Sequence, residues 1–174
     1  DIDKDVAVRE IANTGVIGAG TMGRGIVISL ADSGLPVTVV ESSRKALDNG
    51  MLAISKTYDG MIQRGRIDRS EKDRRLARIT GGVGFDSLAE VDLVIEAAFE
   101  DLDVKKQIFG ELDSIAKSGA ILATNTSYMD IDAIAAATSR PQDVIGMHYF
   151  VPANAMRMLE VVRPAKAAPD AIAT

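Results

Sequence analysis

Short hydrophobic runs alternate along the chain with segments in which hydrophobic residues recur every three or four positions. The runs are typical of strands buried on both faces of a parallel sheet, and they lie around residues 16–17 and at 37–41, 91–97, 120–126, 144–150 and 158–162. The segments with helical spacing lie at residues 22–31, 104–116 and 129–138. Strands that alternate with helices predict an α/β fold of the Rossmann type, with a doubly wound and mostly parallel sheet.

One segment departs from this alternation. Between residues 47 and 62, hydrophobic residues recur at helical spacing, which predicts an amphipathic helix of about four turns. Gly65 ends this helix, and Ser70, with Asp73 three residues later, predicts the start of a second one. The sequence therefore predicts a helical hairpin inserted after the second strand, and the strand–helix alternation returns only after residues 80–85.

The chain has the size of one domain, with 174 residues. Residues 1–10 are charged and show no pattern, so we expect a lead-in arm there. Residues 164–174 are rich in alanine and proline, which predicts the start of a linker or a helix. Because the chain begins at Asp1 without a methionine, we expect this domain to come from a longer protein.

Composition narrows the classes of function. The net charge is −5 and acidic and basic residues are mixed, which argues against a nucleic-acid surface. No hydrophobic run approaches the roughly 18 residues of a membrane span. The lack of cysteine excludes thiolate nucleophiles and cysteine-ligated zinc, and a single histidine excludes a histidine-rich metal site. We expect a cytoplasmic protein without a metal, with targeting to an organelle as the alternative.

A glycine-rich turn follows the first predicted strand and opens the first helix. Gly18, Gly20 and Gly23 fit the dinucleotide fingerprint G-x-G-x-x-G, with Thr21 and Met22 inside it. Gly18 would allow a tight turn, Gly20 the close approach of a pyrophosphate, and Gly23 close packing of helix on strand. The helix N-terminus would offer free N–H groups to the phosphates. A plain strand–helix turn is the alternative, and the context favours a dinucleotide site.

Glu41 ends the second predicted strand, 23 residues after Gly18. This is close to the offset of about 20 residues expected for the acid that binds an adenosine ribose. A carboxylate there would accept hydrogen bonds from the ribose hydroxyls and repel a 2′-phosphate, so the sequence predicts NAD rather than NADP. Arg44, close by in the sequence, would weaken this preference for NAD over NADP. The alternative is a solvated acid at a strand end.

His148 is the only histidine, and it stands near the carboxyl end of a predicted strand, with Glu160 twelve positions later in another hydrophobic run. Open α/β sheets bind ligands outside the carboxyl ends of their strands. An imidazole there can take up a proton near neutral pH. His148 could be a packed core residue, a metal ligand or a catalytic base. The first is the usual role of a lone histidine on a strand.

Four stretches, in this order, make the chain resemble the NAD-binding domain of the 3-hydroxyacyl-CoA dehydrogenases. They are VIGAGTMGRGI, VIEAAFEDLDVKKQIFGELD, ILATNTSYMDIDAIA and GMHYFVPANAMRMLEVV. The last stretch is most similar to the dehydrogenase part of multifunctional enzymes of fatty-acid β-oxidation. The resemblance implies oxidation of an L-3-hydroxyacyl-CoA to the 3-oxoacyl-CoA, with hydride transfer to NAD.

The resemblance also implies the catalytic residues. His148 matches the family's catalytic base, Glu160 the glutamate paired with it, and Ser127 a serine near the reacting oxygen. A carboxylate behind the imidazole would fix its tautomer and stabilise the imidazolium. For Glu160, the alternative is an acid at a strand edge that pairs with Arg157 or Arg163.

Further matches concern the cofactor and the CoA group. Asn125 matches a residue near the nicotinamide ribose, and Glu100 and Lys105 match residues near the nicotinamide half of NAD. Thr57 and Arg64, in the predicted hairpin, match the region that touches CoA. Lys105 could instead belong, with its neighbour at position 106, to the solvated face of a helix. The acids at positions 92, 96 and 101 are assigned no role.

The chain departs from the family's pattern in three respects. Val151 stands where the family has Asn or Ser, which removes a polar contact beside the histidine. Arg24 stands where a small residue is common. The family's second, all-helical domain, which supplies an asparagine, closes over the substrate and makes the dimer, does not lie within these residues. We therefore expect residues 1–174 alone to be inactive or nearly so, and a homodimer to depend on that domain.

Two other functions compete with the dehydrogenase. A non-catalytic NAD-binding module would keep the glycine loop and Glu41 but would have no use for the pair formed by His148 and Glu160. A related dehydrogenase, such as one acting on 3-hydroxybutyryl-CoA or on a free hydroxy acid, would share the fold. The predicted hairpin favours a CoA ester.

Overall fold

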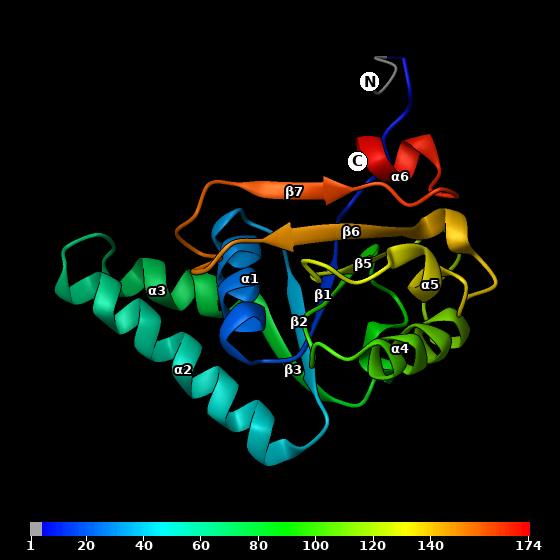
Figure 1. The fold of residues 1–174 in the computed structure, drawn as a ribbon. Coiled ribbons are helices and arrows are strands. Elements are labelled where there is room, and N and C mark those ends of the chain that lie inside the picture. Colours follow the sequence, from blue (N-terminus) through cyan, green and yellow to red (C-terminus); the bar gives the residue numbers. More distant parts are fainter. Residues whose placement is uncertain (1–4) are drawn as a thin grey trace.

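A seven-stranded sheet forms the centre of the structure, a computed structural model that describes residues 5–174 (Figure 1). The strands are β1 (Thr14–Ile17), β2 (Val37–Glu41), β3 (Ile79–Val83), β4 (Leu93–Glu96), β5 (Ile121–Thr124), β6 (Val144–Tyr149) and β7 (Leu159–Val162). Their order is β3-β2-β1-β4-β5-β6-β7, and every neighbouring pair is parallel except β6 and β7. Strands are added on one side of β1 up to β3 and on its other side from β4 onward, which is the strand order of the Rossmann fold. The predicted fold is therefore confirmed.

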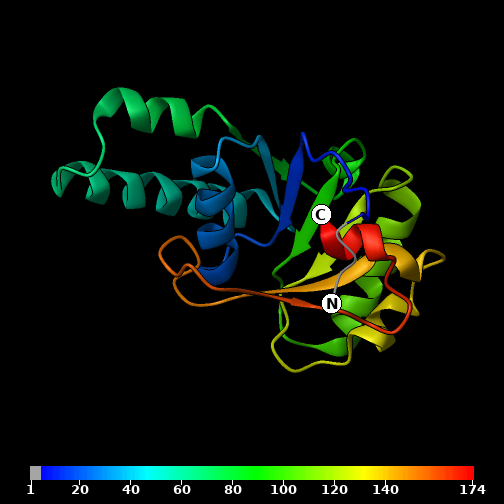
Figure 2. The same ribbon diagram turned by 90° about the horizontal axis from the view of Figure 1, so that it is seen from above.

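Helices cover both faces of the sheet (Figures 1 and 2). They are α1 (Thr21–Asp32), α2 (Arg44–Gln63), α3 (Arg69–Leu76), α4 (Leu102–Ile115), α5 (Ile131–Ala135) and α6 (Pro169–Ala173), with short 3₁₀ helices at Asp86–Leu88 and Pro141–Asp143. Successive strand residues point to opposite faces. Val16 therefore packs in the core with α1 and α2, and Ile17 in the core with α4 and α5. Among the described residues, no helix is long and apolar enough to cross a membrane.

The predicted hairpin is formed by α2 and α3, which project from one side of the sheet (Figure 1). Its second helix starts earlier than predicted. The carboxylate of Asp68 accepts a hydrogen bond of 2.7 Å from the backbone N–H of Glu71 and caps the helix. The predicted start at Ser70 is therefore wrong. The cap residue is Asp68, two positions earlier, and its carboxylate satisfies a free N–H group of the first turn. The hairpin is tied to α1 by the buried Tyr58, whose hydroxyl donates to Asp32 at 2.9 Å.

The strand β3 was absent from the predicted elements. It pairs with β2 at the edge of the sheet, with Thr80 opposite Thr38. Gly81 and Gly82 weaken the strand signal, because glycine has no side chain to pack. The site is tight at Gly81, where a Cβ atom would lie 3.1 Å from the side chain of Leu47 on α2.

The two terminal segments pack against each other. The Arg9 guanidinium forms ion pairs with Asp143 at 2.7 Å and with Asp170 of α6 at 2.9 Å. These interactions raise the pKa of Arg9, with the hydrogen bond to Asp170 as the largest cause. In the described part of the segment predicted as a lead-in arm, Arg9 thus lies against the C-terminal helix, which residues 164–174 contain; residues 1–4 of that segment lie outside the described residues.

Candidate cofactor pocket and catalytic pair

The three glycines of the fingerprint have different surroundings. Gly18 has a positive φ of 94°, and a Cβ atom there would lie 2.8 Å from the carbonyl oxygen of Ala97. A Cβ atom at Gly23 would lie 1.8 Å from the carbonyl oxygen of Gly18, whereas one at Gly20 would meet nothing within 4 Å. The glycines at 18 and 23 are therefore required by the fold. Gly20 leaves open space outside the loop, where a dinucleotide's pyrophosphate would approach.

The N-terminus of α1 faces this space. Gly20 is its N-cap residue, and no side chain among the described residues caps the helix. Helix N-termini carry unpaired N–H groups and a partial positive charge, which together bind phosphate. The loop therefore fits the pyrophosphate of a dinucleotide, and Thr21 and Met22 begin the helix there.

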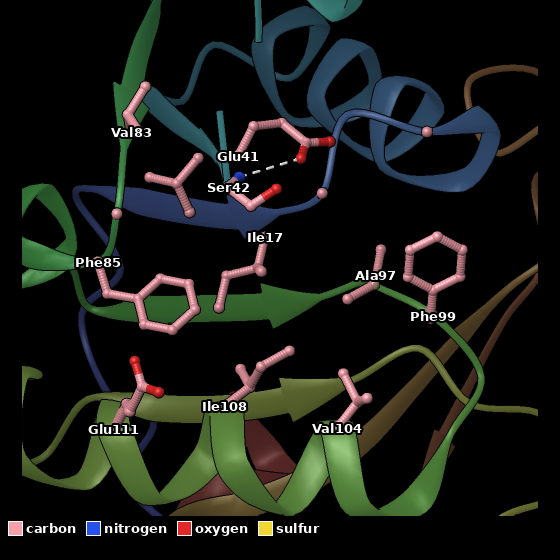
Figure 3. Close-up of a pocket in the computed structure, with 15 residues that line it drawn as sticks. Ile17, Glu41, Ser42, Val83, Phe85, Ala97, Phe99, Val104, Ile108 and Glu111 are labelled. Atoms are coloured by element: carbon pink, nitrogen blue, oxygen red, sulfur yellow. Dashed lines mark hydrogen bonds between the residues drawn. The ribbon is translucent and has the colours of Figure 1, made fainter. Parts of the chain in front are cut away.

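A cavity of about 640 Å³ opens beside the glycine loop, between the sheet and α4 (Figure 3). This volume is in the range of small-molecule sites. Its walls are mostly hydrophobic, and Val83, Phe85 and Ile108 supply surfaces on which a flat aromatic ring could pack. The polar side chains in the wall are those of Glu41, Ser42 and Glu111.

Glu41 lies where the cavity meets the glycine loop. One carboxylate oxygen accepts a hydrogen bond of 2.7 Å from the backbone N–H of Ala19. The other accepts one of 3.2 Å from the backbone N–H of Ser42 (Figure 3). Each carboxylate oxygen can accept a second hydrogen bond. The side chain is thus fixed in place by backbone donors and retains acceptor capacity for two hydroxyl groups.

A second cavity of about 420 Å³ adjoins the first, and Ala97 and Ala98 line both. It brings together most of the residues predicted for the nicotinamide end and for catalysis, namely Glu100, Lys105, Asn125, Ser127 and His148, with Met22 of the glycine fingerprint beside them. They come from α1, α4, β6 and the segments that follow β4 and β5. The second cavity therefore lies at the carboxyl edge of the parallel strands, where open α/β sheets bind ligands.

His148 and Glu160 face each other across β6 and β7, where they are directly opposed. The Nδ1 atom of the imidazole lies 2.8 Å from a carboxylate oxygen of Glu160. The His148 side chain is 20% exposed and that of Glu160 is 48% exposed. A packed core histidine is therefore not what the structure shows, and Glu160 pairs with His148 rather than with Arg157 or Arg163. With Nδ1 occupied, Nε2 is left to meet a ligand.

Asn125 and Ser127 follow β5 at the same edge. The side-chain oxygen of Asn125 accepts a hydrogen bond of 2.8 Å from the backbone N–H of Tyr149, which fixes the end of β6 beside His148. Ser127 is exposed at the wall of the second cavity. Val151 lies in the same wall and is 64% exposed.

The structure corrects one expectation about a charged residue and shows a buried acid beside it. Lys105 is 1% exposed, so its alternative place on a solvated helix face is wrong. Its ammonium forms ion pairs with Glu96 at 2.8 Å and with Glu100 at 3.2 Å. Glu96, to which the sequence assigned no role, is fully buried. The sequence carried one indication of this burial, because Glu96 stands inside the hydrophobic run at 91–97, where an unpaired charge would be costly.

The two residues matched to the CoA region lie elsewhere. Thr57 and Arg64 are on α2 and at its C-cap, and neither lines the two cavities. The Thr57 hydroxyl donates to the carbonyl oxygen of Ala53 at 3.0 Å, and Arg64 is exposed. Arg24, on α1, is also absent from both cavity walls. A contact of Thr57 and Arg64 with CoA stays a prediction.

Known proteins share the sequence pattern and the fold of this chain. Residues 13–174 match the model of the family described as 3-hydroxyacyl-CoA dehydrogenase, NAD binding domain. The chain is 43% identical to the peroxisomal bifunctional enzyme of Cavia porcellus, over 98% of this chain and 23% of that protein. It is 38% identical to the 3-hydroxybutyryl-CoA dehydrogenase of Clostridioides difficile, over 84% of this chain and 52% of that protein.

A solved structure shows the same fold. The 3-hydroxybutyryl-CoA dehydrogenase of Escherichia coli superposes with a TM-score of 0.92 at 36% identity, over 95% of this chain and 35% of that one. The chain thus spans about a quarter of the length of the bifunctional relative and about half of that of the Clostridioides difficile relative.

Proposed function

The chain belongs to the 3-hydroxyacyl-CoA dehydrogenase family, as its NAD-binding domain, and on that basis we propose that it oxidises an L-3-hydroxyacyl-CoA with His148 as the base. The observation that carries this proposal is the 2.8 Å contact of Glu160 with His148, which lines a cavity adjoining the proposed cofactor pocket. A module that only binds NAD has no need of an oriented histidine there.

The chemistry follows from the positions of these side chains. Bound NAD supplies the acceptor for the hydride that leaves the substrate's C3 carbon. His148 takes the proton of the 3-hydroxyl on Nε2, as a positioned general base does. Glu160 holds the imidazole through Nδ1 and stabilises the imidazolium that forms. Ser127 donates a hydrogen bond to the 3-oxygen and places it beside His148. In the reverse direction, the imidazolium returns the proton to the 3-oxo group.

The adenosine half of the cofactor fits the first cavity. We propose that Glu41 accepts hydrogen bonds from the hydroxyls of the adenosine ribose and that Gly18, Gly20 and Gly23 surround the pyrophosphate. Glu100, Lys105 and Asn125 belong to the nicotinamide end. Support for this assignment comes from the two adjoining cavities, since a dinucleotide has two halves joined by a pyrophosphate.

The substrate is proposed to be a CoA ester, with Thr57 and Arg64 on the hairpin near its CoA group. Relatives of both kinds, peroxisomal bifunctional enzymes and 3-hydroxybutyryl-CoA dehydrogenases, match the chain. Comparing acetoacetyl-CoA with longer 3-oxoacyl-CoA esters would separate a short-chain enzyme from a general one.

We also propose that segments outside these 174 residues complete the substrate site. Glu160 is half exposed, and hydrophobic side chains beside it on β7 are open to solvent, including Val161, which is 48% exposed. Proton abstraction beside a hydride transfer works best in a site that excludes water. An additional domain, such as the helical one that completes the family's fold, would cover this face.

Replacing Glu41 with alanine tests the proposed cofactor preference. The wild-type protein is expected to bind NADH well above NADPH, because the Glu41 carboxylate would repel a 2′-phosphate. Glu41→Ala should weaken NADH by about tenfold, the value of one hydrogen bond to a charged group, and narrow the gap to NADPH. Both cofactors can be titrated by calorimetry, with Glu90→Ala, an exposed acid outside the cavity walls, as the control. Equal affinity of the wild type for NADH and NADPH would remove Glu41 from this role.

A further inference from the structure

The second cavity rests on a buried acid that neither the sequence motifs nor the proposed chemistry uses. Glu96, the last residue of β4, is 0% exposed. Its carboxylate accepts four hydrogen bonds: two from the Lys105 ammonium at 2.8 and 2.9 Å, one from the Ala98 N–H at 2.8 Å and one from the Thr124 hydroxyl at 2.7 Å. Every acceptor site of the carboxylate is thus filled by a donor from the carboxyl edge of the sheet.

Glu96 and Lys105 depend on each other. Lys105 is 1% exposed, and a buried ammonium is tolerated only when it is paired and fully hydrogen-bonded. An ammonium has three N–H groups. Lys105 donates two hydrogen bonds to Glu96, and its ammonium also forms an ion pair with Glu100 at 3.2 Å. Lys105 therefore acts as a bridge between two carboxylates.

The second carboxylate of this bridge faces the cavity. The Glu100 side chain is 35% exposed and lines the cavity near His148. The hydroxyl of the buried Thr126 donates to the same carboxylate. The charges thus run from the core to the cavity as carboxylate, ammonium and carboxylate, and only the outermost group is accessible to a ligand.

Glu96 also holds the wall between the two cavities. The backbone N–H of Ala98 donates to its carboxylate, and Ala97 and Ala98 line both cavities. A change in the Glu96 side chain would therefore shift two features together, the turn after β4 and the position of the Glu100 carboxylate.

We propose that Glu96 is a positioning residue for the nicotinamide end of the cofactor. It acts through Lys105 and the Ala98 amide, which set Glu100 and the turn after β4, and it does not touch the ligand. This inference rests on the proposed function, in which the nicotinamide half enters the second cavity and the adenosine half the first. It predicts that Glu96 matters for a complete dinucleotide and not for a ligand that fills only the first cavity.

The test compares NADH with ADP, which lacks the nicotinamide riboside. Both are titrated by calorimetry into the wild type, Glu96→Gln, Lys105→Met and the double variant. We expect each single variant to weaken NADH by about tenfold, the value of one hydrogen bond between the ligand and the displaced Glu100 carboxylate, with ADP affinity unchanged. The double variant should lose no more than the worse single one, because residues that act as a unit are not additive. It should also melt higher than Lys105→Met, which leaves Glu96 buried without its partner.

Each other outcome decides against a stated part of the account. If Glu96→Gln binds NADH like the wild type, or loses NADH and ADP to the same extent, Glu96 has no positioning role. If the wild type itself binds no NADH, the proposed function fails instead. Should Glu96→Gln not fold, Thr124→Val, which removes one neutral donor to Glu96, takes its place. NADH should then weaken by about threefold, a small neutral hydrogen-bond effect, with ADP unchanged, and an unaltered NADH affinity would overturn the inference.

Discussion

Replacing His148 with glutamine is expected to lower turnover by about 10²–10⁴-fold, the usual contribution of a general base, while NADH binding persists. The imidazole lies in the wall of the second cavity with Nδ1 held by Glu160. Glutamine fills similar space but cannot take up the hydroxyl proton. Turnover is measured with acetoacetyl-CoA and NADH in an enzyme that carries this domain together with its substrate-covering part, and NADH affinity is measured by calorimetry.

Neighbouring variants separate this role from general damage to the strands. Glu160→Gln should also slow turnover, because the imidazolium loses its carboxylate partner. Arg163→Gln, an exposed residue directly after β7, should leave the rate unchanged. A near-normal rate for His148→Gln would make the histidine a strand residue without a chemical role.

Replacing Gly20 with valine is expected to weaken NADH binding by at least about 100-fold, because a side chain there would keep the pyrophosphate from two or more N–H groups of the loop and helix. The fold should tolerate the change. Gly20 has a φ of −69°, which any residue adopts, and its Cβ atom would meet nothing within 4 Å. The variant should therefore melt close to the wild-type temperature, and NADH affinity is measured by calorimetry.

Gly23→Ala provides the contrast. Its Cβ atom would lie 1.8 Å from the carbonyl oxygen of Gly18, so this variant should lose stability before it loses any specific contact with the cofactor. If Gly20→Val instead bound NADH like the wild type, the glycine loop would not be the pyrophosphate site.

The elements that the sequence predicted well have strong local signals. Runs of β-branched residues indicated β1, β2 and β4, and the fingerprint marked the turn into α1, because hydrophobic periodicity and glycine chemistry act within a few residues. The strand β3 escaped because it contains Gly81 and Gly82, and the glycine at 81 faces Leu47 on a helix distant in sequence. The place of β3 in the sheet depends on contacts with residues distant in sequence, and a local hydrophobic pattern does not show such contacts.

The same distinction applies to the site. His148 and Glu160 could be paired in advance because the family resemblance joined them, and the register of β6 and β7 places them face to face. The bridge from Glu96 through Lys105 to Glu100 could not be predicted, since a lysine on a helix is usually solvated. Only the packing of α4 on the sheet shows that this ammonium is buried.

The most direct test of the central claim is the oxidation of NADH by acetoacetyl-CoA, followed by the loss of NADH absorbance. It compares residues 1–174 alone with the same residues joined to a C-terminal helical domain of the family. The account predicts rapid oxidation by the joined protein, little with NADPH, and a rate lower by about 10²-fold or more for residues 1–174, because a substrate held loosely is misplaced from the nicotinamide. No oxidation of NADH by the joined protein, or an equal rate for residues 1–174 alone, would contradict it.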